Sequence, residues 1–300
     1  MINVYEQVDR NKRRSLVIMV IFVIFITGVV WLFSQALNYG SGIVGWALIL
    51  SGLMSFASYW WSDKIILALS KARPADKKRD FKFFTVTENL SLASQIPIPK
   101  LYVIEDSAPN AFATGRDINH AVICATTGLI DKLNRTELEA VVAHEISHIR
   151  NYDMRLMSMV TILVGMIVLI SDWFLRGSQF GGRSRNREGG NVGAILFLIG
   201  LILALLSPLI AKLIQLALSR RREFLADASG VMLTKYPDGL ISALQKISAD
   251  KEPLEVANKA TAHLYIVNPF KGSLARGWAV NLFNTHPPIG ERIKNLKEMG

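Results

Sequence analysis

A run of 48 residues between Arg14 and Asp63 contains no Asp, Glu, Lys or Arg. One helix needs roughly 20 apolar residues to cross a bilayer, so this run is long enough for two crossings. We therefore predict transmembrane helices at 16–37 and 43–61, joined by a glycine-containing turn at 38–42. A cleaved signal peptide followed by a buried helix fits less well, because the first apolar run is too long for a signal sequence.

Basic residues lie on both outer sides of this predicted pair, whereas the turn between the two helices carries no charge. Because loops rich in Lys and Arg stay in the cytoplasm, we expect the N-terminus and the segment after the second helix to be cytoplasmic. The basic residues concerned are Arg10, Lys12, Arg13, Arg14, Lys64, Lys71, Arg73, Lys77, Lys78 and Arg79.

The composition agrees with a membrane protein. Of the 300 residues, 51% are hydrophobic and 19% are charged, against roughly 25% charged residues in a typical soluble domain. These values exclude a disordered chain, a coiled coil and a typical nucleic-acid-binding domain. The net charge of +10 therefore indicates the basic flanks of membrane segments, and no nucleic-acid partner is expected. Cys124 is the only cysteine, which excludes an intrachain disulfide.

Two further apolar stretches, at 156–175 and 192–218, flank a loop rich in Gly and Arg at 176–191. They predict a second hydrophobic hairpin. It either crosses the bilayer, lies in its near leaflet or packs on the soluble domain, and the alternatives stay open because the arginines of the loop disfavour export. The predicted domain organisation has three parts: a cytoplasmic N-terminus with the first hairpin at 1–62, a soluble protease domain formed by 63–155 together with 219–300, and the second hairpin at 156–218.

The segment from His144 to His148 carries the chemistry, and it lies within a predicted helix that begins after Asn134. The two histidines are four residues apart, so their imidazoles share one helical face and can bind one Zn²⁺. Glu145 is offset by one residue and can accept the proton of a water at the ion, as in zinc peptidases with the His-Glu-x-x-His motif. A chance match in a chain of this composition is expected roughly 0.003 times, so an ordinary surface helix is a poor explanation.

A catalytic zinc ion usually has three protein ligands, so one more is needed. Met154 stands where a metzincin has its third histidine, which excludes that class. Glu223 and Asp227 also lie four residues apart on one predicted helical face. One of these carboxylates can bind the ion while the other orients a histidine ring, and their spacing does not decide which does which.

Taken together, these residues make the chain similar to the HtpX-type membrane zinc metalloproteases, a family related to the CAAX-prenyl endopeptidases. The resemblance extends along essentially the whole chain, and it implies that Glu223 is the third zinc ligand, with Asp227 and Asp153 behind the ligands. The shared segments are the N-terminal helix pair, Asn110 to Gly115, His144 to His148, Asn151 to Asp153, Glu223 to Asp227, and Thr285 to Pro288.

The resemblance also implies an edge strand at Asn110, Ala111 and Phe112, to which a peptide substrate adds as a further strand. By analogy with related zinc peptidases, we expect His286 to stabilise the oxyanion of the tetrahedral intermediate, acting with Glu145 as a catalytic residue. The alternative is a histidine that only packs at the start of the helix after Pro287 and Pro288, since no spacing rule fixes its role. The predicted fold is mainly α with a small antiparallel β-sheet, as in an α+β zincin. Its strands are expected at 101–104, 111–114 and 121–125.

The predicted function is that of a membrane-bound endopeptidase with one Zn²⁺ per chain. Its expected substrates are membrane proteins or unfolded polypeptides, cleaved on the cytoplasmic side of the cell membrane in protein quality control. If unbroken helices join the metal site to the second apolar pair, the site lies roughly 12–17 Å from that pair, just beneath the bilayer. A non-catalytic membrane metal-binding scaffold and a prenyl-peptide-processing endopeptidase are the alternatives.

Overall fold

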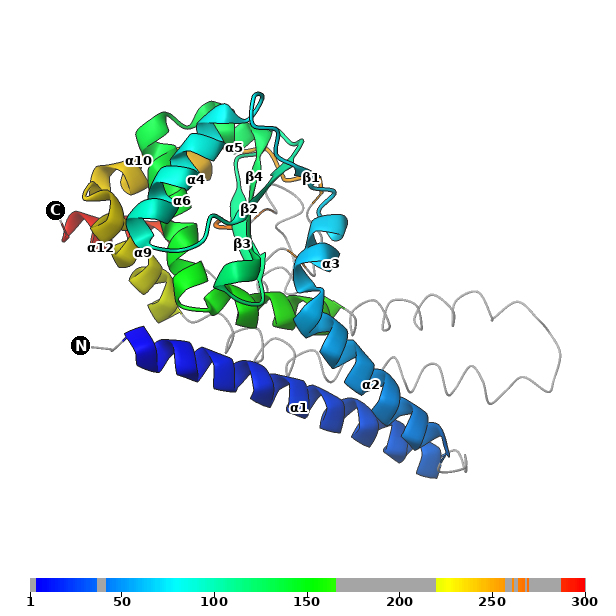
Figure 1. The fold of residues 1–300 in the computed structure, drawn as a ribbon. Helices are drawn as coiled ribbons and strands as arrows, with labels where there is room; N and C mark the ends of the chain where they lie inside the picture. Colours follow the sequence, from blue (N-terminus) through cyan, green and yellow to red (C-terminus); the bar gives the residue numbers. More distant parts are fainter. Residues whose placement is uncertain are drawn as a thin grey trace.

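A computed structural model describes residues 4–36, 42–165, 220–256 and 287–299, together with 261, 264–267 and 269 (Figure 1). The predicted turn at 38–42 lies almost wholly outside these residues, and so does the second apolar hairpin beyond residue 165. His286 is also outside them. The predicted three-part division of the chain therefore stays a prediction.

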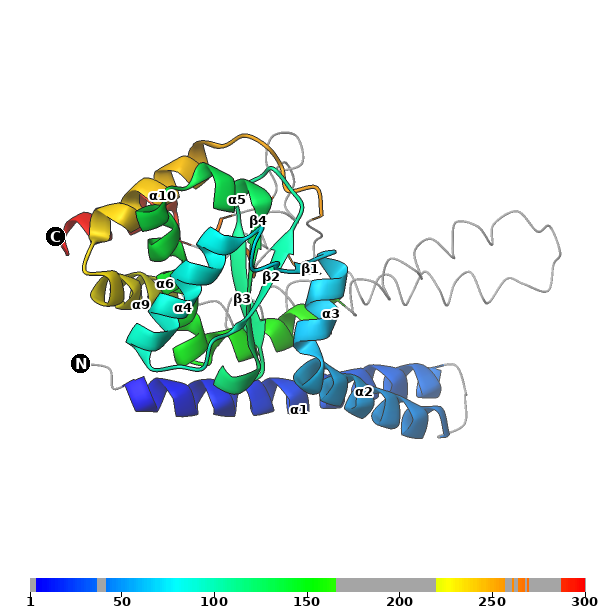
Figure 2. The same ribbon diagram turned by 45° about the horizontal axis from the view of Figure 1, so that its top comes forward.

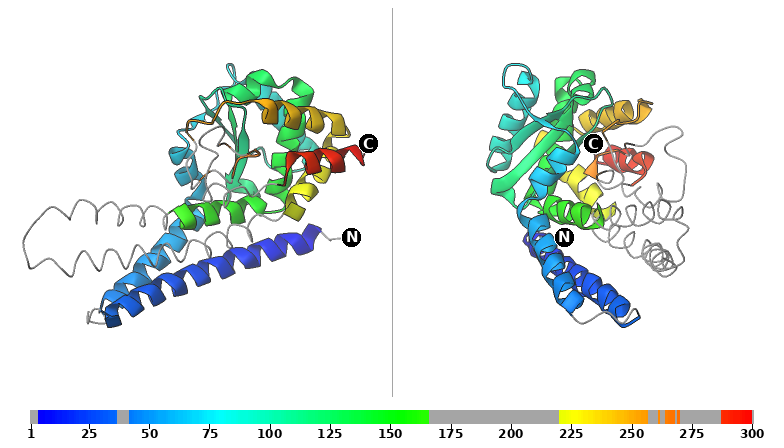
Figure 3. Two further views of the ribbon diagram at one scale, coloured as in Figure 1. Left: turned by 180° about the vertical axis from the view of Figure 1, so that it is seen from behind. Right: turned by 90° about the vertical axis from the view of Figure 1, so that its right-hand side faces the viewer.

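Two long helices, α1 (Val4–Ala36) and α2 (Gly42–Trp60), form a pair beneath the rest of the molecule (Figures 1 and 3). They cover the two predicted apolar segments, and large apolar side chains are exposed along both of them. The most exposed include Ile24 at 66% and Trp46 at 67%. Among the residues that the structure describes, no helix combines the length and the apolarity that a membrane crossing requires.

A small sheet lies above the helix pair, with the strand order β1-β2-β4-β3. The strands are β1 (Arg73–Pro74), β2 (Lys100–Ile104), β3 (Ala111–Gly115) and β4 (Ala121–Thr126). β3 pairs with β4 antiparallel, and β1 pairs with β2 antiparallel, but β2 and β4 are parallel. The prediction of an antiparallel sheet is therefore wrong: the sheet is mixed, because the chain crosses from β2 to the far edge before β4 returns between them.

Helices cover the sheet on both sides (Figures 1 and 2). α3 (Ser62–Leu69) lies on one side, and α6 (Arg135–Arg150), α9 (Arg220–Thr234) and α10 (Pro237–Ala249) lie on the other. α6 is the central helix. Its residues between Leu138 and Ile149 are almost all buried, and the apolar ones belong to the main core. The described part of this body also contains α4 (Phe81–Ser94), α5 (Thr127–Lys132) and α12 (Ile289–Lys297).

Both ends of α6 have a clear local cause. At the start, the Asn134 side chain accepts from the Glu137 N–H, and the Glu137 carboxylate accepts from the Asn134 N–H, so the predicted capping box is present. At the end, Tyr152 has φ 58°, a left-handed conformation that stops the helix. Residues 153–165 then form a new helix, so the unbroken helix assumed between His148 and residue 156 is wrong.

Candidate active site

The helix α6 brings the two histidines of the motif together. His144 and His148 lie one turn apart on a buried face, with exposed fractions of 1% and 5%. Their Nε2 atoms are 3.2 Å apart, so both rings present the same nitrogen to one point. The predicted pairing on one helical face is therefore present.

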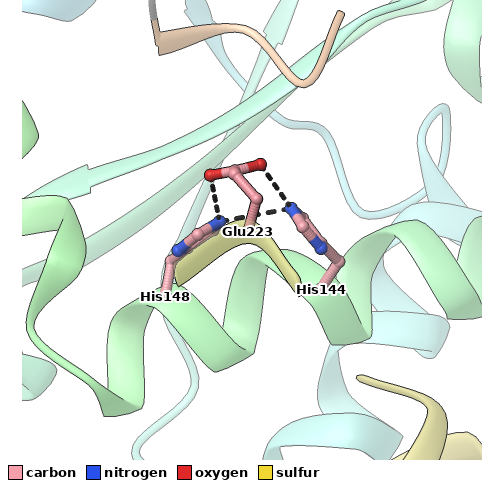
Figure 4. Close-up of side chains that lie close together, drawn as sticks. All are labelled: His144, His148 and Glu223. Atoms are coloured by element: carbon pink, nitrogen blue, oxygen red, sulfur yellow. Dashed lines mark hydrogen bonds and ion pairs between the residues drawn. The ribbon is translucent and has the colours of Figure 1, made fainter. Parts of the chain in front are cut away.

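The third group of the site comes from α9. Glu223 is 2% exposed, and its carboxylate faces both imidazoles (Figure 4). One oxygen lies 3.8 Å from Nε2 of His144 and the other lies 3.5 Å from Nε2 of His148. α9 lies close to α6 at Gly230, where a Cβ would lie 3.2 Å from the His144 backbone nitrogen, a tighter contact than most side chains make.

These three groups fit a catalytic zinc ion by chemistry and by spacing. Two imidazoles and one carboxylate leave a fourth position open, as catalytic zinc sites require. Ligand atoms about 2.0–2.1 Å from a tetrahedral ion lie roughly 3.3 Å from one another. The three separations here are 3.2, 3.5 and 3.8 Å. Among the described residues, His144, His148 and Glu223 are the one such group that could hold a metal ion.

Asp227 and Arg292 lie behind His144. The Asp227 carboxylate is 2.8 Å from Nδ1 of His144, one turn after Glu223 on α9. Arg292 of α12 is fully buried and donates to both carboxylate oxygens, at 2.6 and 2.9 Å. Burial alone would raise the pKa of Asp227, but the Arg292 guanidinium and the His144 ring lower it to about 2. Asp227 therefore stays ionised and fixes which nitrogen of His144 points to the site.

Asp153 occupies the corresponding position behind His148, at 3.2 Å from its Nδ1. Burial lowers the pKa of His148, but Asp153, Glu223 and Glu145 outweigh it and raise the value to about 9. The pKa of His148 is raised because buried negative charge exceeds buried positive charge around it. Four carboxylates surround the histidine pair, whereas two buried guanidinium groups, those of Arg222 and Arg292, oppose them. The formal excess of two negative charges matches a divalent cation.

Glu145 is 3% exposed and borders the same hollow as the histidines. The hollow is lined by Ala113, His144, Glu145, His148, Met157, Leu264 and Ile266. Glu145 therefore lies next to the candidate ligand cluster without belonging to it, a position that suits the predicted general base.

Comparison with known proteins gives the family. The model of peptidase family M48 matches residues 78–300. The chain belongs to this family. Three relatives named "Protease HtpX homolog" are 43–45% identical to it. That of Dictyoglomus thermophilum matches over 99% of this chain and 95% of its own length, and those of Caldanaerobacter subterraneus and Thermoanaerobacter pseudethanolicus each match over 98% and 97%.

A solved structure, Ste24p of S. mikatae, is similar to this M48 chain at 21% identity and a TM-score of 0.46, over 97% of this chain and 67% of that one. The relationship to the HtpX-type proteases that the motifs predict is confirmed by the family match and by the relatives. The predicted roles of single residues stay predictions.

The predicted substrate strand corresponds to β3, which is an edge of the sheet in this M48 family member. Residues 266 and 267 of the same chain already lie along the beginning of this strand. The Asn110 amide donates to the Val267 carbonyl at 2.9 Å, and the Ala111 carbonyl accepts from the Ile266 N–H at 3.0 Å. Phe112 is fully buried against Tyr265. Ala113 is the strand residue that borders the metal hollow, so it is better placed for a substrate than Asn110, Ala111 or Phe112.

Arg292 and Asn11 are the functional candidates that the sequence did not indicate. Arg292 holds Asp227, the partner of His144, and lies 148 positions from that histidine. Asn11 lies 142 positions from Asp153. No spacing rule links residues so far apart. The available signals were weak: a lone Arg after the Pro287–Pro288 pair and a lone Asn before an apolar run.

Proposed function

We propose that this M48 family member is a membrane-bound, zinc-dependent endopeptidase of the cell membrane, with its protease domain on the cytoplasmic side. Its proposed substrates are membrane proteins and unfolded polypeptides, and its proposed role is protein quality control. The observation that carries the proposal is the convergence of His144, His148 and Glu223 beside Glu145, all of them buried.

The chain's own groups divide the reaction between them. His144, His148 and Glu223 would hold the ion, and a bound zinc supplies the Lewis acidity that polarises the scissile carbonyl and acidifies water. Glu145 takes the proton of the attacking water and delivers it to the nitrogen of the leaving amine. His286 is proposed as the further donor to the oxyanion.

The substrate is proposed to bind along β3. The backbone N–H and C=O groups of residues 112 and 114 of this strand point towards β4, as does the C=O of Asn110 just before it, since the Thr126 N–H donates to the Asn110 carbonyl at 3.0 Å. By alternation, the N–H and C=O groups of Ala113 point away from β4, towards the open side of the sheet. An extended peptide pairing with Ala113 would run past Glu145 and the histidine pair.

Two features support a location at the membrane. The first is the set of large apolar side chains exposed on α1 and α2, since a soluble protein rarely leaves so much apolar surface open. The second is a pair of cation–π contacts where α2 meets the body. Arg116 stacks on Trp60 at 4.7 Å and Arg155 stacks on Tyr59 at 4.6 Å. Aromatic and basic residues gather at the interface of a bilayer with water.

The central test is Glu145→Gln in the full-length protein, purified in detergent and assayed with a membrane-protein substrate. We expect zinc binding to be retained and the cleavage rate to fall about 10²–10⁴-fold, the contribution of a general base. Glu139→Gln is the matched control, because Glu139 lies on the outer face of the same helix and pairs with Arg135. Equal rates for Glu145→Gln and the control would refute the mechanism.

Substrate choice separates the remaining functions. If the protein is a metal-binding scaffold, the unmodified protein will bind zinc and cleave no substrate. If it is a prenyl-peptide-processing enzyme, it will cleave only prenylated substrates. Moving the cleavage site away from the bilayer on longer linkers should slow cleavage by a membrane-bound protease. Unchanged cleavage at every linker length would count against a site close to the membrane.

A further inference from the structure

Asp153 connects the candidate metal site to a residue at the other end of the sequence. Its Oδ2 atom faces Nδ1 of His148 at 3.2 Å, while its Oδ1 atom accepts from Nδ2 of Asn11 at 2.8 Å. Asn11 belongs to α1, which passes beneath the body (Figure 1). The carboxylate is 1% exposed, so these protein groups replace the water that would otherwise orient it.

The Asn11 side chain is itself fixed. It is 2% exposed, and its Nδ2 atom also donates to the Asn151 carbonyl at 2.8 Å. Its Oδ1 atom lies 3.4 Å from the guanidinium of Arg222, which is also 3.4 Å from Asp153. Both amide hydrogens therefore meet acceptors and the amide oxygen meets a cation, which defines a single orientation of the side chain.

The two Asn11 bonds cross the break between α6 and the helix that follows it. Asn151 is the residue after the last turn of α6, and Asp153 begins the next helix. Tyr152 between them has the left-handed φ of 58°. Local hydrogen bonding does not hold such a turn as firmly as a continuous helix would. Asn11 thus fixes the segment that determines where the Asp153 carboxylate points.

We propose that Asn11 is a positioning residue for the metal site: it holds Asp153, and Asp153 aims Nε2 of His148 at the ion. The proposal rests on the proposed role of His148 as a zinc ligand. Groups behind a metal ligand commonly change metal affinity 10–100-fold when they are removed. Asn11 contacts Asp153 and not the histidine itself, so we expect the zinc affinity to fall by about tenfold when Asn11 cannot donate its hydrogen bonds.

This contact also couples the docking of α1 to metal binding. Coupling between two equilibria is reciprocal. If docking of α1 raises the zinc affinity by some factor, bound zinc shifts the docking equilibrium of α1 by the same factor. The helix that is proposed to anchor the chain at the bilayer is therefore also part of what holds the histidine pair in place.

The test compares zinc affinities of the full-length protein in detergent, measured by competition with a chromophoric chelator. Asn11→Leu keeps the approximate size of the side chain and removes its hydrogen bonds, and we expect about tenfold weaker zinc binding. Two controls lie on the same helix. Asp9→Asn changes an exposed residue, and Phe22→Ala removes buried apolar contacts of α1 without touching Asp153. Both controls should keep the zinc affinity within twofold when it is measured below their melting temperatures, where α1 stays docked, although Phe22→Ala should lower the melting temperature of the metal-free protein.

A double-mutant cycle tests whether the contact is direct, and it serves if Asn11→Leu does not fold. Asn11→Asp places two carboxylates face to face, and adding Asp153→Asn restores one donor and one acceptor. We expect the double variant to bind zinc more tightly than the sum of the two single losses predicts. Additive losses would overturn the proposal, and so would an affinity for Phe22→Ala as weak as that for Asn11→Leu.

The proposed function has its own readout in the same experiment. If the unmodified protein binds zinc and His148→Ala does not, the metal site stands, and equal affinity of Asn11→Leu and the unmodified protein refutes the role of Asn11 alone. If His148→Ala binds zinc as tightly as the unmodified protein does, the metal site and the role of Asn11 both fall.

Discussion

Replacing Arg292 should damage both the stability and the proposed metal site, because its side chain connects α12 through Asp227 to His144, a proposed zinc ligand. Arg292 is fully buried and holds Asp227 by two hydrogen bonds, at 2.6 and 2.9 Å, while Asp227 faces His144 at 2.8 Å. Removing one partner of a buried ion pair leaves the other charge unpaired and costs about 3–5 kcal/mol. For a chain of this size, that loss corresponds to a fall in melting temperature on the order of 10 °C.

The chain provides its own reporter for this measurement. Cys124 is the only cysteine and is buried, and burial raises the pKa of its thiol, so a thiol-reactive dye labels it only after unfolding. We expect Arg292→Gln to unfold about 10 °C lower than the unmodified protein and to bind zinc 10–100-fold more weakly. Arg292→Lys should lie between the two, since lysine keeps the charge and loses the paired geometry.

The control for Arg292→Gln is Lys294→Gln, an exposed position on the same helix, which should change neither quantity. A lower melting temperature with unchanged zinc affinity would mean that Arg292 only packs α12 against the body. An unchanged melting temperature would refute the argument from the buried ion pair itself.

Three further outcomes are expected. Gly230→Val should weaken zinc binding more than tenfold in the same competition assay, because even a Cβ there lies 3.2 Å from the His144 backbone and forces α9 away from α6. Asn134→Ala should cost about 1 kcal/mol, seen as a small fall in melting temperature, with zinc affinity unchanged because the cap lies at the far end of α6. The metal-free protein should lose stability as pH rises from 6.5 to 9, since the pKa of His148 is raised to about 9 and its stabilisation is complete only below its unfolded value of 6.5. Thermal unfolding in the presence of a chelator checks this, and a His148→Ala variant with the same pH dependence would contradict it.

Local rules were sufficient to predict the helix that carries the two histidines and the three longer strands of the sheet. The start of α6 follows from Asn134 and Glu137, whose side chains cap the first turn within three residues. The histidine pair follows from the helical repeat. The three predicted strands lie within one residue of β2, β3 and β4, because each is a short apolar run bounded by turn residues. In all three cases the interaction that decides the structure spans only a few residues.

Pairings between distant segments could not be predicted in the same way. The parallel register of β2 and β4 depends on the path of the intervening chain, and no pattern within either strand specifies it. The two residues of β1 are too few to show any alternation. The break after α6 occurs at Tyr152, a tyrosine with a left-handed φ, where a glycine would have been the recognisable signal.

The supports of the metal site lie beyond sequence reasoning for a further physical reason. Two ligands on one helix must share a face, so they have a recognisable spacing in the sequence. A group that holds the carboxylate behind a ligand can approach from any direction, so it has no such spacing. Arg292 reaches Asp227 from α12, and Asn11 reaches Asp153 from α1, so helices far apart in the sequence hold the partners of the two proposed ligand histidines. A site built in this way is complete only when both terminal helices have docked. Removing either terminal helix should therefore lower zinc affinity, although neither helix supplies a ligand.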